Sequence, residues 1–118
     1  MATITTKLVL TSSSATTDIL DLTLISTLNI ENPVSLGRMS VPFSSALSLI
    51  TANPTVTYAY IKNIDAANTI ILRNGAGETF GLLSPGEFMF VPIQEAAGLE
   101  LQSTVADCIA EYGYWTQA

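Results

Sequence analysis

The stretch Tyr58–Ile93, YAYIKNIDAANTIILRNGAGETFGLLSPGEFMFVPI, decides the fold of this 118-residue chain. It holds four short apolar runs that are separated by three turn signals. Asn74-Gly75 is a strong turn signal, because both residue types accept positive φ angles. Pro85-Gly86 fits a type II turn, in which Pro sets φ to about −65° and Gly accepts the positive φ that follows. The stretch therefore predicts four consecutive antiparallel strands, held in register by these turn residues.

Alternation of apolar and polar residues marks the N-terminal part of the chain as well. Residues 4–11 place three aliphatic side chains on one face, and residues 18–31 alternate over a longer run. A period of two predicts half-buried strands, because a helix would scatter the same leucines around its circumference. We expect residues 18–31 to form one strand, or two strands broken near Ser26.

Two further segments complete the pattern. Residues 44–51 are either a helical turn with a serine N-cap or another short strand, and the sequence leaves both open. Residues 105–115 alternate so that Cys108 and Tyr114 share one face while Trp115 lies on the other. A closing strand is therefore expected near the C-terminal end.

The whole pattern predicts an all-β fold of about eight to ten short strands with little or no helix. Each strand has one apolar face to bury against a second sheet, which favours an antiparallel β-sandwich or a jelly-roll-like arrangement. We expect residues 1–17 to form an N-terminal arm or edge strand. Residues 18–118 are expected to form a single β-sandwich domain, as the length of the chain suggests.

The composition points to association with other chains. Only 12% of the residues are charged, about half of the roughly 25% typical of soluble domains. Fifteen threonines and eleven serines supply the polar surface instead. A charge-poor, threonine-rich surface favours coverage by other protein chains. The alternative is a compact monomer that its hydroxyl groups keep in solution.

The charge balance excludes several classes of partner. The net charge is −6, and the four cations are scattered along the chain. Nucleic-acid binding depends on neutralising phosphates, and anionic membranes need basic clusters, so neither partner is expected. We expect neither a signal peptide nor a membrane-spanning run. The single cysteine cannot form an intrachain disulfide, which fits a protein made in a reducing compartment.

The residues that usually carry catalysis are scarce. The chain has no histidine, which excludes Ser-His-Asp and Cys-His nucleophilic sites, and one cysteine cannot build a zinc site alone. Cys108 is expected to be a buried, inert thiol. The carboxylates are expected at solvated loop and outward strand positions; those considered as an acid–base pair are Glu87, Glu95, Glu100, Asp107 and Glu111. We therefore expect no enzyme activity, no cofactor and no metal.

Three motifs resemble the small structural proteins of tailed bacteriophages. They are Tyr60–Asn63 (YIKN), Leu83–Phe88 (LSPGEF) and Glu111–Tyr112 in the late strand. The resemblance covers residues 58–115. It implies a β-sandwich or jelly-roll capsid cement (decoration) protein. Such a protein binds the outside of the major capsid protein lattice and stabilises the head, often as a homotrimer.

The resemblance also implies a location and an alternative role. The expected location is the virion surface, after synthesis in the host cytoplasm. The alternative is a tail, adaptor or fibre module that binds a neighbouring virion protein or a host glycan. In either case the resemblance brings no catalytic residues with it.

Candidate interface residues lie near both ends of the chain. Trp115 is the first candidate anchor, because tryptophan is enriched at interaction hot spots, although core packing would explain it as well. Tyr114 is its neighbour. In the N-terminal arm the candidates are Lys7, Leu8 and Leu10, since an extended segment can pair with a partner's sheet edge.

Overall fold

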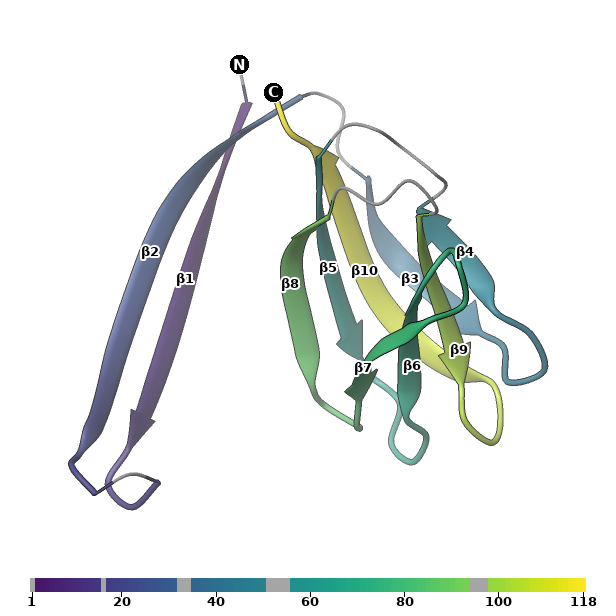
Figure 1. Cartoon of the computed structure of the whole chain (residues 1–118), viewed down its shortest axis with the longest axis horizontal. Coiled ribbons are helices and arrows are strands. Elements are labelled where there is room, and N and C mark those ends of the chain that lie inside the picture. The colour runs from purple at the N-terminus through teal and green to yellow at the C-terminus, as the bar shows by residue number, and fades with distance from the viewer. Residues whose placement is uncertain (1, 16, 32–34, 51–55, 94–97) are drawn as a thin grey trace.

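The computed structural model of the chain describes residues 2–15, 17–31, 35–50, 56–93 and 98–118. Within these ranges the chain forms ten strands and no helix, so the all-β prediction is confirmed. The strands make two four-stranded antiparallel sheets that pack in a sandwich-like manner, and a separate two-stranded arm (Figure 1). In chain order the strands are β1 (Ala2–Ser12), β2 (Leu20–Ile30), β3 (Ser35–Val41), β4 (Leu47–Ile50), β5 (Thr57–Asn63), β6 (Ile70–Asn74), β7 (Thr79–Leu83), β8 (Phe88–Ile93), β9 (Leu99–Ser103) and β10 (Cys108–Thr116).

The core lies between the two four-stranded sheets, whose orders are β3-β10-β5-β8 and β4-β9-β6-β7. The first sheet contributes Val41, Ile61 and Ala110, and the second contributes Ile70 and Leu101. All five side chains are fully buried. Because side chains alternate along a strand, the opposite face of each sheet remains available for other contacts.

The four strands of the stretch Tyr58–Ile93 divide between the two sheets. β5 pairs with β8 in the first sheet, and β6 pairs with β7 in the second. The strands are consecutive in sequence, but the chain crosses to the second sheet after β5 and returns to the first before β8. This connectivity brings the two ends of the stretch side by side.

Asn63, at the end of β5, bonds both to the segment that leaves the first sheet after β5 and to the segment that returns to it before β8. Its buried side-chain amide donates to the carbonyl oxygens of Asn68 at 2.7 Å and Leu83 at 2.8 Å. Its Oδ1 accepts a bond from the Asp65 backbone N–H at 3.0 Å. The backbone of Asn63 also exchanges bonds with the Ser84–Glu87 turn, because Gly86 N–H donates to its carbonyl oxygen at 2.8 Å.

The tight turns use glycine where the backbone requires positive φ. In the Ser84–Glu87 turn, Gly86 has φ +85° and Glu87 N–H donates to the Ser84 carbonyl at 3.0 Å, which is type II geometry. In the β6–β7 turn the positive φ lies at Gly77 rather than at Gly75, which the sequence had suggested. The loop is longer than a two-residue turn because Asn74 Oδ1 accepts bonds from two later backbone N–H groups.

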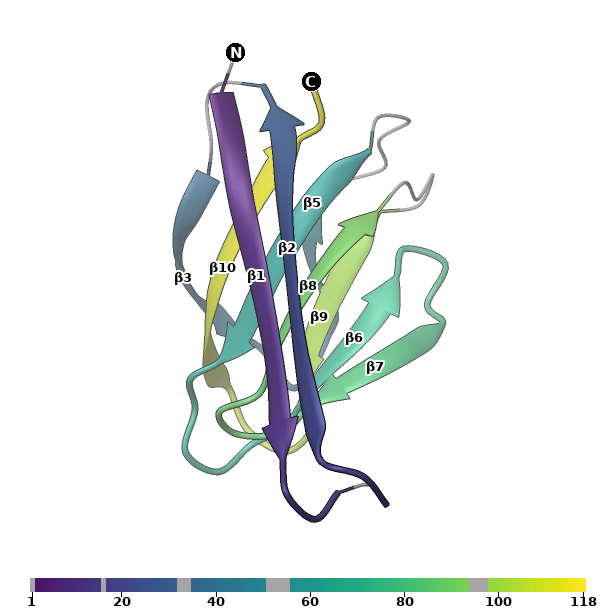
Figure 2. The same ribbon diagram turned by 90° about the vertical axis from the view of Figure 1, so that its left-hand side faces the viewer.

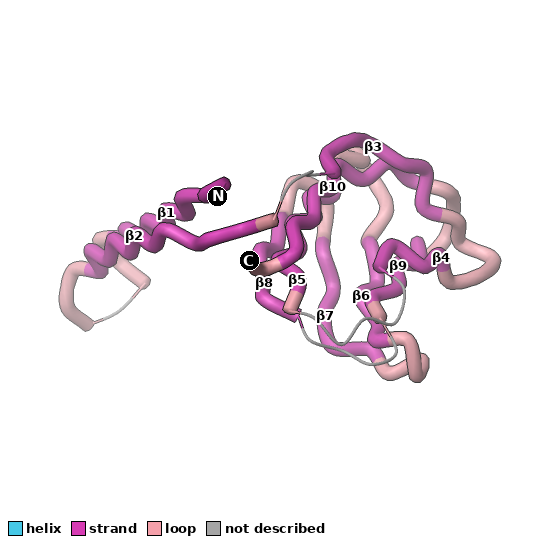
Figure 3. The backbone as a smooth tube through the Cα atoms, turned by 90° about the horizontal axis from the view of Figure 1, so that it is seen from above, coloured by secondary structure: helices cyan, strands magenta, loops and turns pink. Residues whose placement is uncertain are grey.

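The arm is a hairpin of two eleven-residue strands. β1 and β2 pair without a break from Ala2↔Ile30 to Ser12↔Leu20, so residues 20–30 form one continuous strand. β2 falls within the range expected for the sandwich but pairs with β1, outside both four-stranded sheets. Figure 3 shows the arm standing apart from the sandwich.

The base of the arm is attached to the end of β10. Ile30 forms a bridge with Gln117, and Glu31 N–H donates to the Thr116 carbonyl at 2.8 Å. Ala118 N–H donates to the Asn29 carbonyl at 3.1 Å. The arm therefore leaves the sandwich in a direction that backbone hydrogen bonds define.

One segment that the sequence left open is resolved as a strand, and the predicted closing strand is confirmed. Residues 47–50, left open between helix and strand, form β4 at one edge of the second sheet. The closing segment forms β10, which lies between β3 and β5. β8 is an edge strand of the first sheet and carries the exposed Pro92, which fits the confinement of proline to edge strands.

Replacing Gly86 tests the turn geometry directly. No heavy atom lies within 4 Å of a Cβ built there, so the cost of a side chain comes from the backbone alone. We expect Gly86→Val to lower the free energy of unfolding by about 1–2 kcal/mol, and Gly86→Asn by less, because Asn tolerates the left-handed region. Thermal unfolding followed by circular dichroism measures both. Equal stability of Gly86→Val and the parent chain would contradict the turn assignment.

Candidate functional site

The arm has one apolar face and one threonine-rich face, which also carries Lys7, Val9 and Ile25. Residues directly opposite one another in an antiparallel ladder project to the same side. The register therefore pairs Leu8 with Leu24 and Leu10 with Leu22 on one side. We call this side the leucine face; its large aliphatic members are Ile4, Leu8, Leu10, Leu20, Leu22, Leu24 and Leu28.

The leucine face is largely uncovered. Leu8 is 41% exposed, Leu10 43% and Leu24 55%, while Ile30 at the base is buried. A lone two-stranded hairpin is at best marginally stable in water, and large exposed apolar surfaces usually mark interaction sites. The exposed apolar surface of the arm is therefore of the kind that usually contacts another protein surface.

A cluster of aromatic rings lies on the outer face of the β3-β10-β5-β8 sheet. Tyr58 stacks on Phe90 with ring centroids 6.1 Å apart, and Phe90 meets Trp115 at 6.5 Å. Alternation places Tyr60 and Phe88 on the same side, and Phe88 is 62% exposed. We call these five side chains the aromatic face.

The leucine face and the aromatic face border one open cleft. The cleft has a volume of about 890 Å³, and its lining includes Leu8 and Leu24 from the arm and Tyr60, Phe88 and Phe90 from the sheet. Figure 2 shows the arm passing in front of β5, β8 and β10, and Figure 1 shows the gap that separates them. The cleft is therefore bounded by two different parts of the chain, and on the arm its lining also includes the polar side chains of Thr6, Lys7 and Ser26.

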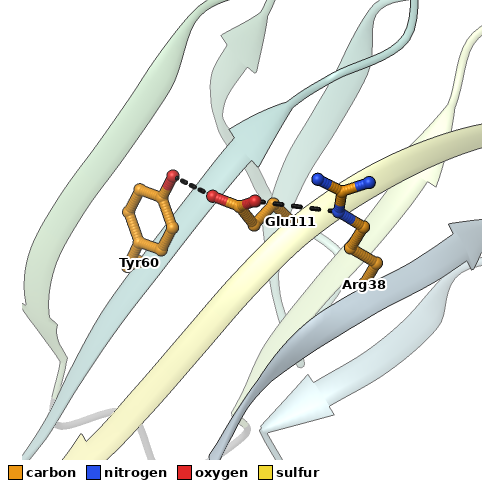
Figure 4. A network of polar contacts seen from close by, with 3 residues as sticks. All are labelled: Arg38, Tyr60 and Glu111. Atoms are coloured by element: carbon orange, nitrogen blue, oxygen red, sulfur yellow. Dashed lines mark hydrogen bonds and ion pairs between the residues drawn. The ribbon is translucent and has the colours of Figure 1, made fainter.

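A small polar network lies beside the aromatic face (Figure 4). Tyr60 Oη donates to Glu111 Oε1 at 2.8 Å, and Arg38 Nε lies 3.8 Å from Glu111 Oε2. The Arg38 side chain is 69% exposed, so this ion pair contributes little to stability. Burial, together with the hydrogen bond and the negative charge of Glu111, raises the pKa of Tyr60 to about 12.

Gly113 leaves room for the Trp115 indole. A Cβ built at Gly113 would lie 2.8 Å from Cη2 of Trp115 and 3.1 Å from Cδ1 of Leu36. The contact with Cη2 is closer than real Cβ atoms show, and the contact with Leu36 is tight, so a side chain at position 113 would force the indole to shift. The placement of Trp115 in the aromatic face depends on this glycine.

The structure places the predicted interface residues in two groups. Lys7 and Leu8 line the cleft, and Leu10 lies on the leucine face nearer the tip of the arm. Trp115 belongs to the aromatic face. Tyr114 points the other way, where it packs against the core and stacks on Tyr112.

Sequence reasoning missed most of the aromatic face as a unit. Tyr58 and Tyr60 lie two residues apart on β5, and Phe88 and Phe90 do the same on β8. The spacing places each pair on one face of its strand. Only the pairing of β5 with both β8 and β10 brings these pairs together beside Trp115.

Two of the carboxylates considered as an acid–base pair, Glu87 and Asp107, have structural partners. Glu87 Oε1 accepts a bond from Ser84 N–H at 2.6 Å, and Asp107 Oδ1 accepts one from Phe43 N–H at 3.2 Å. Cys108 is buried, and desolvation raises the pKa of its thiol. Glu95 lies outside the described residues. In the part of the chain that the structure describes, no three His, Cys, Asp or Glu residues gather as metal ligands, and no helix is suited to crossing a membrane.

Comparison with known proteins adds no relative to this picture. Neither family models nor searches of curated proteins and solved structures gave a match to this chain.

Tyr60 should titrate late in the folded protein. The folded state holds its phenolic proton more tightly than the unfolded state, so this group stabilises the fold below about pH 10 and loses that contribution as the pH rises towards its folded pKa of about 12. Tyrosinate absorbance against pH should show a late component that Tyr60→Phe removes. Glu111→Gln should move this component to lower pH without restoring the ordinary value, because burial, the largest single cause of the raised pKa, remains. An unchanged curve for Tyr60→Phe would contradict the assignment.

Gly113→Ala should displace the indole of Trp115. We expect a loss of about 1 kcal/mol or more from overpacking. The emission of Trp115, the single tryptophan, should change at the same time. Gly37→Ala is the matched control, because its Cβ would meet Tyr112 at an ordinary 3.4 Å. Fluorescence and thermal unfolding of both variants measure the difference, and equal behaviour would refute the proposed packing.

Proposed function

We propose that this chain is a structural assembly protein of a phage particle, of the capsid decoration type. It would bind the outside of the major capsid protein lattice and stabilise the head. The observation that carries the proposal is the arm, whose apolar face the chain's own sandwich leaves exposed. Such a surface fits a protein that works by being covered by neighbouring chains.

The resemblance of residues 58–115 to phage structural proteins is the reason for proposing a phage particle. The physical properties of the chain support the assembly role. The surface is poor in charge, and the threonine-rich face of the arm is available for contacts on the side opposite the leucine face. Binding would come from buried apolar area. Many weak contacts repeated over a lattice add up through multivalency, so each copy needs only modest affinity. A homo-oligomer, with a trimer favoured, would present several such surfaces at once.

The polar residues of the sheet support binding rather than catalysis. Glu111 is held by Tyr60 and Arg38, and the Tyr60 phenol keeps its proton up to high pH. A general acid–base pair would need groups that titrate near the working pH. We therefore propose no enzyme activity.

Purified particles test this function through copy number and stability. If the chain decorates the head, its stained band should approach the major capsid protein band in molar amount. Particles stripped of the protein should then lose their DNA at a lower temperature or at a milder osmotic shock, and adding the protein back should restore them. A handful of copies per particle would instead assign the protein to the tail. Binding on a glycan array would favour the fibre alternative.

A further inference from the structure

We propose that a second copy of this chain covers the arm, so that the leucine face of one copy seats on the aromatic face of another. The inference deepens the proposed function and rests on its assembly role, because it names the first partner in assembly. The contact forms between purified copies, without any particle, so the two proposals can fail separately.

Both halves of the contact are present and exposed in the same chain. Leu8, Leu22 and Leu24 on the arm are 41%, 37% and 55% exposed. On the sheet, Phe88 of the aromatic face is 62% exposed, Tyr60, Phe90 and Trp115 are half-buried, and Tyr58 is buried. Leu36, next to this face, is 69% exposed. The two surfaces border the same cleft without filling it. Each therefore has the chemistry that the other needs, and neither is satisfied within one copy.

The attachment of the arm disfavours its closure on its own sandwich. Its base is fixed by the Ile30–Gln117 bridge and by the backbone bonds from Glu31 to Thr116 and from Ala118 to Asn29. Its ladder runs from base to tip with no bulge at which the strands could bend. A second copy can reach the leucine face without disturbing either feature.

The charge distribution favours a copy of the same chain over a charged partner. Every copy has a net charge of −6, so two copies repel unless their contact excludes charge. No position of the leucine face from Ala2 to Ile30 is charged, and neither is any side chain of the aromatic face. Asp18 lies near the tip of the arm, and Asp21 lies on the threonine-rich face. Contact between the two faces thus brings no like charges together.

The area is sufficient when every copy both gives and receives an arm. Two eleven-residue strands are about 36 Å long and about 10 Å wide, so one face covers roughly 350 Å². A copy that gives its leucine face and receives another on its aromatic face buries roughly 700 Å² in total, close to the roughly 800 Å² per partner of a standard interface. A single unreciprocated arm would bury only half of this.

Light scattering of the purified full-length chain gives the first test. We expect a mass of at least two copies for the parent chain, and a drop by half or more, to the 12.5 kDa of one chain, for Leu24→Asp. Thr23→Asp is the matched control, because this substitution adds the same negative charge on the opposite face of the same strand. It should keep the parent mass. Circular dichroism should show that both variants remain folded, since both positions are exposed.

Cross-linking between copies of different size gives the second test. One copy carries Leu24→Cys, and a copy lengthened by a tag carries Phe88→Cys; Cys108 is buried and does not compete. A short bismaleimide should join the two copies, and it should fail to do so when Thr23→Cys replaces Leu24→Cys.

The outcomes separate the two proposals. A monomeric parent chain, or an unchanged mass for Leu24→Asp, overturns arm exchange. If the bismaleimide never joins a Leu24→Cys copy to a Phe88→Cys copy, but does join the two cysteines when one chain carries both, the arm contacts its own sandwich, and this also overturns arm exchange. If the parent chain is monomeric yet protects particles, the assembly role stands and a different protein covers the arm.

Discussion

The buried amide of Asn63 is the contact on which the arrangement of this molecule depends. It stands at the point where the chain leaves the first sheet after β5 and where it returns to begin β8. A buried polar side chain is costly unless its groups are paired, and here its donors and its acceptor all have partners. The bonds that satisfy it are the bonds that fix the two crossings. These bonds support the alignment of β5 with β8 that the ladder between the two strands sets, and with it the position of the aromatic face.

The sequence predicted local structure better than it predicted partners between strands. Alternation identified the strands and the two faces of β10, because side-chain direction depends only on the backbone of a single strand. It could not show that β5 neighbours β8, since pairing is decided by contacts far apart in the chain. For the same reason it separated Tyr58 and Tyr60 from Phe88 and Phe90, which the fold unites.

The turns illustrate the same limit on a smaller scale. The Pro85-Gly86 signal matches the observed geometry because both residues act through their own φ angles. At Asn74-Gly75 the local signal was strong, but the Asn74 side chain bonds to residues further along and moves the positive φ to Gly77. The prediction of an N-terminal arm rested on residues 1–17, whereas the arm also needs β2 as its second strand. Only pairing could reveal this.

The arm and the sandwich satisfy their polar groups in the same way but differ in how they bury apolar ones. In the sandwich every strand hides one face against the opposing sheet. In the arm the ladder is complete, yet its leucine face has no opposing sheet in the same chain. Secondary structure is therefore complete within one molecule, while tertiary burial is not. This division explains how a chain with so few charges can present an ordered apolar surface.

Pro92 has a consequence for how such molecules behave when crowded together. It interrupts the outward row of hydrogen-bond donors on β8, the edge strand beside the aromatic face. An uninterrupted edge next to exposed aromatic rings would invite strand after strand to add on, as in cross-β fibrils. Because Pro92 lacks an N–H group, β8 is a poor template for pairing with a further strand. Neighbouring molecules can still contact the exposed side chains of this sheet.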